Sequence, residues 1–193
     1  MSTIDTASTG QNPAAVIVLA AGKGTRMKSK TPKILHEIGG RSMLGHALKV
    51  ARELAPQRIV AVIRHQRDLV AEHIAAVDPE VLTADQSDVP GTGSAVDAGL
   101  EVLDAETPVS GTVLVTYGDV PLLMVDTLRE FVAHHDSHGN AVTVLTADHP
   151  EPGKYGRILR DERGEFAEIK EFKDATDAER AVSEVNSGIF AFD

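Results

Sequence analysis

Residues 14–33, AAVIVLAAGKGTRMKSKTPK, constrain the fold of this chain more than any other stretch. The apolar run that opens the segment is typical of a strand buried inside a parallel sheet, and a glycine ends it abruptly. Because Gly22 and Gly24 have no Cβ, the loop can bend sharply and its amides can approach an anion. Arg26 and Lys33 then supply positive charge where a triphosphate would lie. The segment predicts a phosphate-binding loop after the first strand.

The spacing of this loop excludes two better-known phosphate loops. The dinucleotide fingerprint G-x-G-x-x-G needs a glycine three positions after Gly24, and Met27 stands there. The P-loop G-x-x-x-x-G-K-[ST] does not match either. The loop is similar to L-A-A-G-x-G-x-R-[ML]…P-K, the signature of sugar-nucleotide pyrophosphorylases and related nucleotidyltransferases. The alternative, for this segment alone, is an ordinary strand–loop–helix turn with chance basic residues.

Composition narrows the classes of protein further. The 193 residues are enough for one α/β domain with a real core, and the net charge of −10 argues against a general nucleic-acid binder. The absence of cysteine excludes disulfides and fits the cytosol. Residues 1–13 lack the features of a secretory signal, and the apolar runs fall far short of the ~20 residues of a membrane helix. We expect a cytoplasmic protein with a disordered tail over residues 1–13, no membrane contact and no nucleic-acid partner.

Strand-like and helical patterns alternate along the chain, which is typical of βαβ units and a mostly parallel sheet with helices on both faces. The expected strands are Ala15–Leu19, Arg58–Ile63, Val81–Ala84, Thr112–Thr116 and Ala141–Ala147. The expected helices are Met43–Leu54, Leu69–Val77, Ser94–Leu103 and Val125–His134. After about residue 150 shorter, more polar strands follow at 157–159, 166–169 and 185–192, as in a small β lobe. We expect one domain over residues 14–193 that is incomplete at its C-terminus, because its last strand would be left exposed.

Two further segments follow expected strands, and ligands of open α/β sheets bind beyond the carboxyl ends of strands. Tyr117-Gly118-Asp119 places a carboxylate there, which suits Mg²⁺ shared with phosphate oxygens, although a turn or helix cap is the alternative for a lone aspartate. Gln86 offers a donor and an acceptor that match the imide edge of uracil, and Gly91 leaves room for a flat base. A helix start capped by Thr92 or Ser94 fits the same residues.

Later segments carry short polar groups that suit a sugar with many hydroxyls. They include Gly156, Glu171 and Asn186. Each alone is more often a turn residue. Their order and spacing make them candidates for a sugar site.

Together these segments resemble the uridylyltransferase domain of the bifunctional N-acetylglucosamine-1-phosphate uridylyltransferase / glucosamine-1-phosphate acetyltransferase family. YGDVPL, YGRI, E-x-K-D-A-T-D and E-V-N-S-G carry the resemblance, which runs from about Ala14 to Asp193. It implies a Rossmann-like (GT-A-like) nucleotidyltransferase fold with a sugar-binding β lobe. It also implies that UTP and N-acetylglucosamine 1-phosphate give UDP-N-acetylglucosamine and pyrophosphate, for peptidoglycan and cell-wall synthesis.

The resemblance also implies roles for residues. Arg26 and Lys33 would be catalytic and face the phosphates, and Asp119 would bind Mg²⁺. The nucleotide would be held by Leu19, Ala20, Ala21, Gly22, Gly24, Gln86, Gly91 and Thr92, and the other substrate by Tyr117, Gly118, Asp119, Gly156, Glu171 and Asn186. The parent protein would be a multifunctional enzyme that also acetylates glucosamine 1-phosphate through a C-terminal left-handed β-helix domain, and that domain would make it a homotrimer.

The sequence departs from this family at several places. Pro90 stands where the family usually has Leu, and Ser94 and Phe172 stand where it has His. The family's second Mg²⁺ ligand is an asparagine beyond Asp193. Two alternatives therefore stay open: another nucleotidyltransferase, making a cytidine-linked alcohol phosphate or a guanylylated cofactor, or a non-catalytic nucleotide-binding module.

Two other groups of polar residues are interpreted as solvated. His134, His135 and His138 lie at the end of an expected helix, where they suit its negative dipole end better than a metal. The acidic residues from Asp174 to Glu184 are expected to form an exposed face. No Ser/His/Asp nucleophile set is apparent in the sequence.

Overall fold

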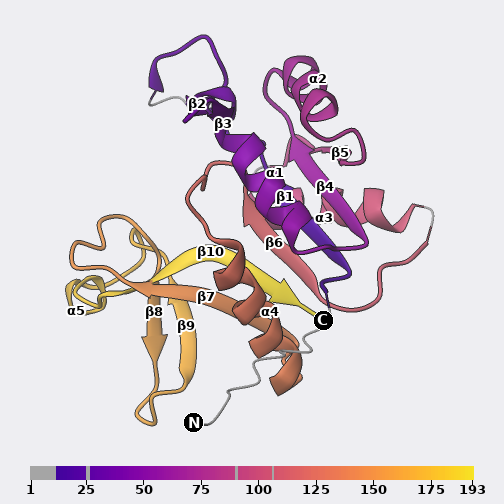
Figure 1. Cartoon of the computed structure of the whole chain (residues 1–193). Helices are drawn as coiled ribbons and strands as arrows, with labels where there is room; N and C mark the ends of the chain where they lie inside the picture. The colour runs from indigo at the N-terminus through magenta and orange to yellow at the C-terminus, as the bar shows by residue number, and fades with distance from the viewer. Residues whose placement is uncertain (1–11, 25–26, 90, 106) are drawn as a thin grey trace, which may run out of the picture. The chain divides into compact units, whose positions relative to one another are not determined.

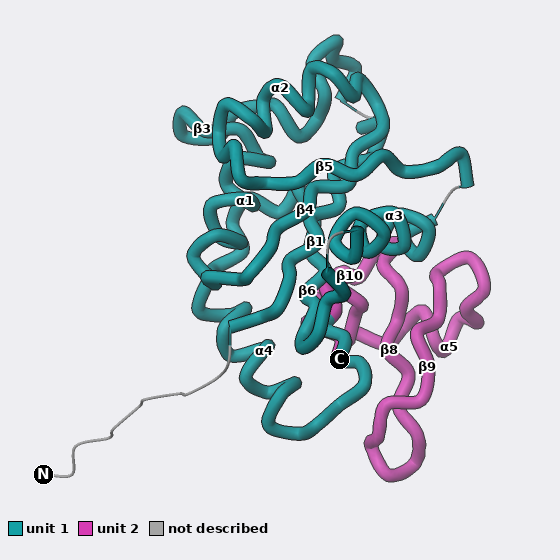
Figure 2. The backbone as a smooth tube through the Cα atoms, turned by 90° about the vertical axis from the view of Figure 1, so that its right-hand side faces the viewer, with its two compact units in different colours: residues 1–142, 191–193 teal, residues 143–190 magenta. Residues whose placement is uncertain are grey.

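The computed structural model describes residues 12–193 except 25–26, 90 and 106. The expected tail therefore lies outside the described residues up to residue 11. The chain divides into two compact units, one formed by residues 1–142 and 191–193 and the other by residues 143–190 (Figure 2). The division comes slightly before the change in composition near residue 150.

The first unit is built on parallel strands in the order β5–β4–β1–β6 (Figure 1). Their bounds are Leu82–Asp85 for β5, Arg58–Ile63 for β4, Ala15–Leu19 for β1 and Val113–Tyr117 for β6. Every residue of β1 is buried, because the strand pairs with β4 on one side and β6 on the other. Burial of both faces explains why this strand shows no polar alternation in the sequence.

Helices cover both faces of these strands, as expected (Figures 1 and 2). The helices are α1 (Met43–Glu53), α2 (Arg67–Val77), α3 (Thr92–Asp104) and α4 (Val125–His138). The helices α1 and α4 lie on one face, and α3 lies on the other. Gly99 lets α3 approach closely, because a Cβ there would lie 3.1 Å from Ile17 Cγ2 and 3.2 Å from Val62 Cγ2.

Short elements that the sequence patterns did not predict connect the first loop to α1. They are a 3-10 turn, η2 (Lys33–Leu35), and two paired strands, β2 (Glu37–Ile38) and β3 (Arg41–Ser42). Gly39 and Gly40 form the connection with φ of +60° and +80°, the backbone that a tight two-residue hairpin requires. Ser42 then caps α1 by accepting a hydrogen bond from the Gly45 amide at 2.9 Å.

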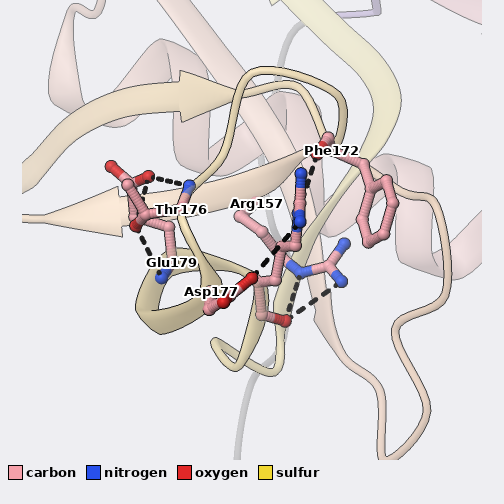
Figure 3. Close-up of polar contacts among 6 residues, drawn as sticks. Arg157, Phe172, Thr176, Asp177 and Glu179 are labelled. Carbon is pink, nitrogen blue, oxygen red and sulfur yellow. Dashed lines mark hydrogen bonds and ion pairs between the residues drawn. The ribbon is translucent and has the colours of Figure 1, made fainter.

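The second unit is an antiparallel β lobe with one short helix. Its elements are β7 (Val142–Asp148), β8 (Arg157–Arg160), β9 (Phe166–Lys170), α5 (Asp177–Arg180) and β10 (Glu184–Phe192). The strand β10 pairs with β7 and with β8, and β8 pairs with β9. A capping box of Thr176 and Glu179 starts α5 (Figure 3).

The expectation of an exposed acidic face is wrong for Glu184. Its side chain is 19% exposed and pairs with the Arg160 guanidinium at 2.7 Å. It also accepts a hydrogen bond from the Thr146 hydroxyl at 2.8 Å. Glu184 begins strand β10 rather than continuing an exposed acidic loop, so its carboxylate is bound by neighbouring strands.

The expectation of a solvated histidine cluster is wrong for His135, which is 2% exposed. The helix α4 continues to His138, so His135 falls at helical spacing on the buried face that carries Leu128, Phe131 and Val132. His134 and His138 are exposed.

In the part of the chain that the structure describes, no group of three or more His, Cys, Asp or Glu residues could hold a metal ion. Among the same residues, no helix is long and apolar enough to cross a membrane.

Candidate active site

A pocket of about 830 Å³ lies in the first unit, beyond the carboxyl ends of β1 and β6. The chain leaves β1 for β4 on one side and later enters β6 on the other, so this is the point where the strand order reverses. The pocket is lined by Leu19, Ala20, Ala21, Gly22, Lys23, Gly24, Met27, Lys33, Ile34, Gln86, Gly91, Thr92, Ala95, Tyr117 and Asp119.

This lining brings together three segments that are far apart in the sequence. It contains every residue predicted to bind the nucleotide, and it contains Lys33, Tyr117 and Asp119. Gly118 does not line the pocket, and Arg26, like Pro90, lies outside the described residues. The roles of these residues in binding and catalysis stay predictions.

Gly24 fixes the course of the first loop. Its φ is +59°, and a Cβ there would lie 2.5 Å from Cβ of Lys33. Gly22 differs, because a Cβ there would meet nothing within 4 Å. The bend of the loop and its contact with the stem of Lys33 therefore require glycine at position 24, whereas the chain's own packing makes no such demand at position 22.

An ion pair crosses the pocket between the loop segment and the end of β6. The Nζ atom of Lys33 lies 2.5 Å from Oδ2 of Asp119, and the two side chains are 31% and 34% exposed. Gly118 holds the turn before Asp119, because its amide donates to the Leu19 carbonyl at 2.9 Å. Asp119 does not cap the following helix, whose N-cap is Met124.

The carboxylate of Asp119 on the pocket wall suits a metal ion that is shared with a ligand better than a metal ion enclosed by protein groups alone. Mg²⁺ prefers oxygen ligands, keeps several waters and is commonly bound through one or two carboxylates together with substrate phosphates. Asp119 supplies one partly exposed carboxylate on the pocket wall. That donor fits Mg²⁺ bound jointly by the chain and a phosphate.

The segment from Gln86 to the start of α3 forms one wall of the pocket. Its Gly91 is the N-cap of α3 with φ of +131°, and no side chain caps the helix. The interpretation of Thr92 or Ser94 as the cap is therefore wrong. The Gln86 side-chain amide donates to the Gly91 carbonyl at 3.0 Å, and the Gln86 backbone amide donates to the Ile63 carbonyl at 2.9 Å. Gln86 thus braces the loop against β4.

Sequence reasoning did not assign four residues that line the pocket: Lys23, Met27, Ile34 and Ala95. Lys23 and Met27 stand inside the loop signature, so their position in that signature was the available signal.

The charge of Lys23 also affects a neighbouring histidine. Burial, followed by the charges of Lys23 and Arg64, lowers the pKa of His65 below its ordinary value.

Within the second unit, the residues predicted for the sugar lie together. The backbone amide of Asn186 donates to the Gly156 carbonyl at 2.9 Å. A Cβ at Gly156 would lie 3.4 Å from Oε1 of Glu171 and 3.7 Å from Cβ of Asn186. We call Gly156, Glu171 and Asn186 the polar cluster. Its role in binding a sugar stays a prediction.

Arg157, to which the sequence motifs assigned no role, follows Gly156 of this cluster directly in the chain. It is 1% exposed, and its guanidinium lies 5.6 Å from the Phe172 ring centroid (Figure 3). An arginine on a strand is usually expected to be exposed, so only its place in the YGRI motif could have drawn attention to it.

A glycine loop, a lysine and a carboxylate at the switch point of a parallel sheet suit a nucleoside triphosphate, and the comparisons place the chain among nucleotidyltransferases. The fold is shared with a solved Bacillus anthracis structure named as a glucose-1-phosphate thymidylyltransferase, in complex with sucrose. The two align with a TM-score of 0.74 over 93% of this chain and 71% of that chain, at 20% identity, which shows the fold alone. Residues 16–185 match the MobA-like NTP transferase domain, and the chain belongs to that family.

Curated relatives are similar over almost the whole chain. The bifunctional protein GlmU of Paenarthrobacter aurescens is 64% identical over 181 residues, which are 94% of this chain and 36% of that protein. The GlmU protein of Thermobifida fusca is 53% identical over 182 residues, 94% of this chain and 38% of that protein. The chain thus spans little more than a third of the length of these relatives. The similarity confirms the resemblance that the sequence motifs indicated.

Proposed function

We propose that this chain is the uridylyltransferase part of a bifunctional enzyme and forms UDP-N-acetylglucosamine and pyrophosphate from UTP and N-acetylglucosamine 1-phosphate. The observation that carries the proposal is the pocket in which Lys33 and Asp119 lie with the glycine loop and Gln86. These groups offer positive charge, amides, a metal-binding carboxylate and a base-pairing amide, as a nucleoside triphosphate requires. The identity with the GlmU proteins supports this choice of substrates.

The reaction is an in-line displacement at the α-phosphorus of UTP. A phosphate oxygen of the sugar phosphate forms the new P–O bond, and the bond to the bridging oxygen breaks, so pyrophosphate leaves with that electron pair. The attacking phosphate is already anionic at neutral pH, so no general base is needed. The chain therefore acts by positioning and by neutralising charge.

Lys33, whose ammonium group lies beside the Asp119 carboxylate, neutralises negative charge on the phosphates. We assign the same task to Arg26. The amides of the glycine loop bind phosphate oxygens. Asp119 would hold Mg²⁺, and that ion would supply positive charge to the phosphates. Gln86 and Gly91 recognise the base. The hydrogen bond from the Gln86 side chain holds the Gly91 carbonyl in place on the pocket wall.

The polar cluster binds the N-acetylglucosamine part of the substrate. The Glu171 carboxylate accepts hydrogen bonds from sugar hydroxyls, and the Asn186 side chain and the Gly156 backbone complete the site. UDP-N-acetylglucosamine then serves peptidoglycan synthesis in the cytoplasm. We assign acetylation of glucosamine 1-phosphate and assembly into a trimer to the part of the relatives that this chain does not match, which is about two thirds of their length.

Pyrophosphate release tests the proposal. We expect turnover with UTP, N-acetylglucosamine 1-phosphate and Mg²⁺, with kcat/KM for CTP and GTP at least ~100-fold lower, because a site built to hydrogen-bond the edge of one base rejects bases with a different edge. Preference for CTP or GTP would identify another nucleotidyltransferase. Calorimetric UTP binding without pyrophosphate release would identify a non-catalytic nucleotide-binding module.

A further inference from the structure

Phe172 lies under two arginine side chains in the second unit (Figure 3). The guanidinium carbon of Arg180 is 4.7 Å from the ring centroid, and that of Arg157 is 5.6 Å away. An aromatic ring attracts a cation above its face, and the attraction grows as the cation loses water. Because Arg157 is 1% exposed, its contact with the ring is of the stronger kind.

The two arginines tie together the segments around the ring. Arg157 donates to the carbonyls of Gly153 at 2.9 Å, Arg180 at 3.2 Å and Tyr155. Arg180 donates through Nε to the Phe172 carbonyl at 3.1 Å and pairs with Asp177 at 3.3 Å. The negative face of the ring adds to the attraction that these carbonyl oxygens supply.

The polar cluster is attached directly to these groups. Gly156 precedes Arg157 in the chain, and Glu171 precedes Phe172. The Glu171 carboxylate reaches the Gly156 backbone, where a Cβ would lie 3.4 Å from Oε1. Movement of the Phe172 ring would therefore move the Glu171 carboxylate relative to Gly156.

We propose that Phe172 is a positioning residue for the sugar site: by holding two guanidinium groups on its ring, it fixes Glu171 beside Gly156 and so sets the affinity for the sugar 1-phosphate. This inference rests on the proposed function and deepens it. A phenyl ring remains uncharged at every pH and cannot repel the two cations.

The test is steady-state kinetics with each substrate varied in turn. For Phe172→Leu we expect the KM for N-acetylglucosamine 1-phosphate to rise about 10-fold, while kcat and the KM for UTP stay within about twofold. Phe172→Tyr keeps the aromatic face and restores the KM of the unaltered chain. Phe166→Leu, at an exposed phenylalanine of the same unit, is the matched control and leaves both KM values unchanged.

The inference is overturned if Phe172→Leu leaves the KM for the sugar phosphate unchanged, raises both KM values alike, or is not rescued by tyrosine. Should the leucine variant fail to fold, Arg180→Met removes the nearer cation and keeps the aliphatic stem, and the same separation of KM values is expected. If the unaltered chain releases no pyrophosphate with any sugar 1-phosphate, both the proposed function and this inference fail. Normal turnover without the KM separation overturns this inference alone.

Discussion

The ammonium nitrogen of Lys33 lies 2.5 Å from Oδ2 of Asp119, although the residues are 86 positions apart in the sequence. Each side chain is about a third exposed on the pocket wall, so a ligand can reach both. Partly exposed ion pairs contribute little to folding. We infer that this pair is arranged for a ligand rather than for stability.

Removing either partner should therefore cost activity far more than stability. We expect Lys33→Met and Asp119→Asn each to lower kcat/KM for pyrophosphate release at least ~100-fold, as the loss of a charge-stabilising group does. The double variant should be little worse than either single one, because groups that act as a unit are not additive. Losses that multiply in a double-mutant cycle would contradict a shared role.

Replacing Gly24 by alanine should disturb both the loop and Lys33. A Cβ at that position would lie 2.5 Å from Cβ of Lys33, and φ is +59°. We expect a loss of roughly 1–2 kcal/mol in the free energy of unfolding, from the left-handed backbone alone, together with weaker UTP binding. Denaturant unfolding and calorimetry measure the two effects. Gly22→Ala, which meets nothing within 4 Å, is the steric control and should leave the free energy of unfolding nearly unchanged.

Thr116→Val should stabilise the first unit. The Thr116 side chain is buried, and its hydroxyl has no hydrogen-bond partner within the described part of the chain. Burying an unpaired hydroxyl is unfavourable, so its replacement by a methyl group of similar size should raise the free energy of unfolding by about 1 kcal/mol. Thr116→Ser keeps the hydroxyl and removes a methyl group, and it should destabilise. Urea unfolding of the two variants tests this, and equal shifts in one direction would contradict it.

The stability of the second unit should depend on the ionisation of Glu184. The hydrogen bond from Arg160 lowers the pKa of Glu184 below its ordinary value of 4.5, against the effect of burial, and Thr146 adds to the lowering. A carboxyl whose pKa is lower in the folded state stabilises the fold above its unfolded pKa, and that stabilisation disappears as the pH falls through the folded pKa. Glu184→Gln should thus lower the melting temperature by a few degrees at pH 7. A difference that persists unchanged well below pH 4.5 would argue against this role.

The sequence predicts the framework of the site because that framework depends on burial and on strand direction. The strand Ala15–Leu19 has the bounds expected from its apolar run, since its residues are buried on both faces. Gln86 and Asp119 meet the glycine loop because the carboxyl ends of parallel strands lie at one edge of the sheet. No side-chain contact needed to be known for that prediction.

What the sequence patterns missed depends on particular side-chain contacts. The ion pair of Lys33 with Asp119 depends on where a flexible four-carbon chain comes to rest, which periodicity does not specify. The buried position of Arg157 depends on three backbone carbonyls and an aromatic ring brought from other segments. His135 was misjudged because the expected helix ended at His134, four residues before the observed end at His138, which hid its place on the buried face.

The absence of a side chain at Gly99 has a consequence for the width of the pocket. Thr92, at the start of the same helix, lines the pocket, while Gly99 sets how near that helix comes to Ile17 and Val62. A bulkier residue at 99 would act as a spacer, tilting the helix outward and widening the mouth of the pocket from a position that no substrate touches.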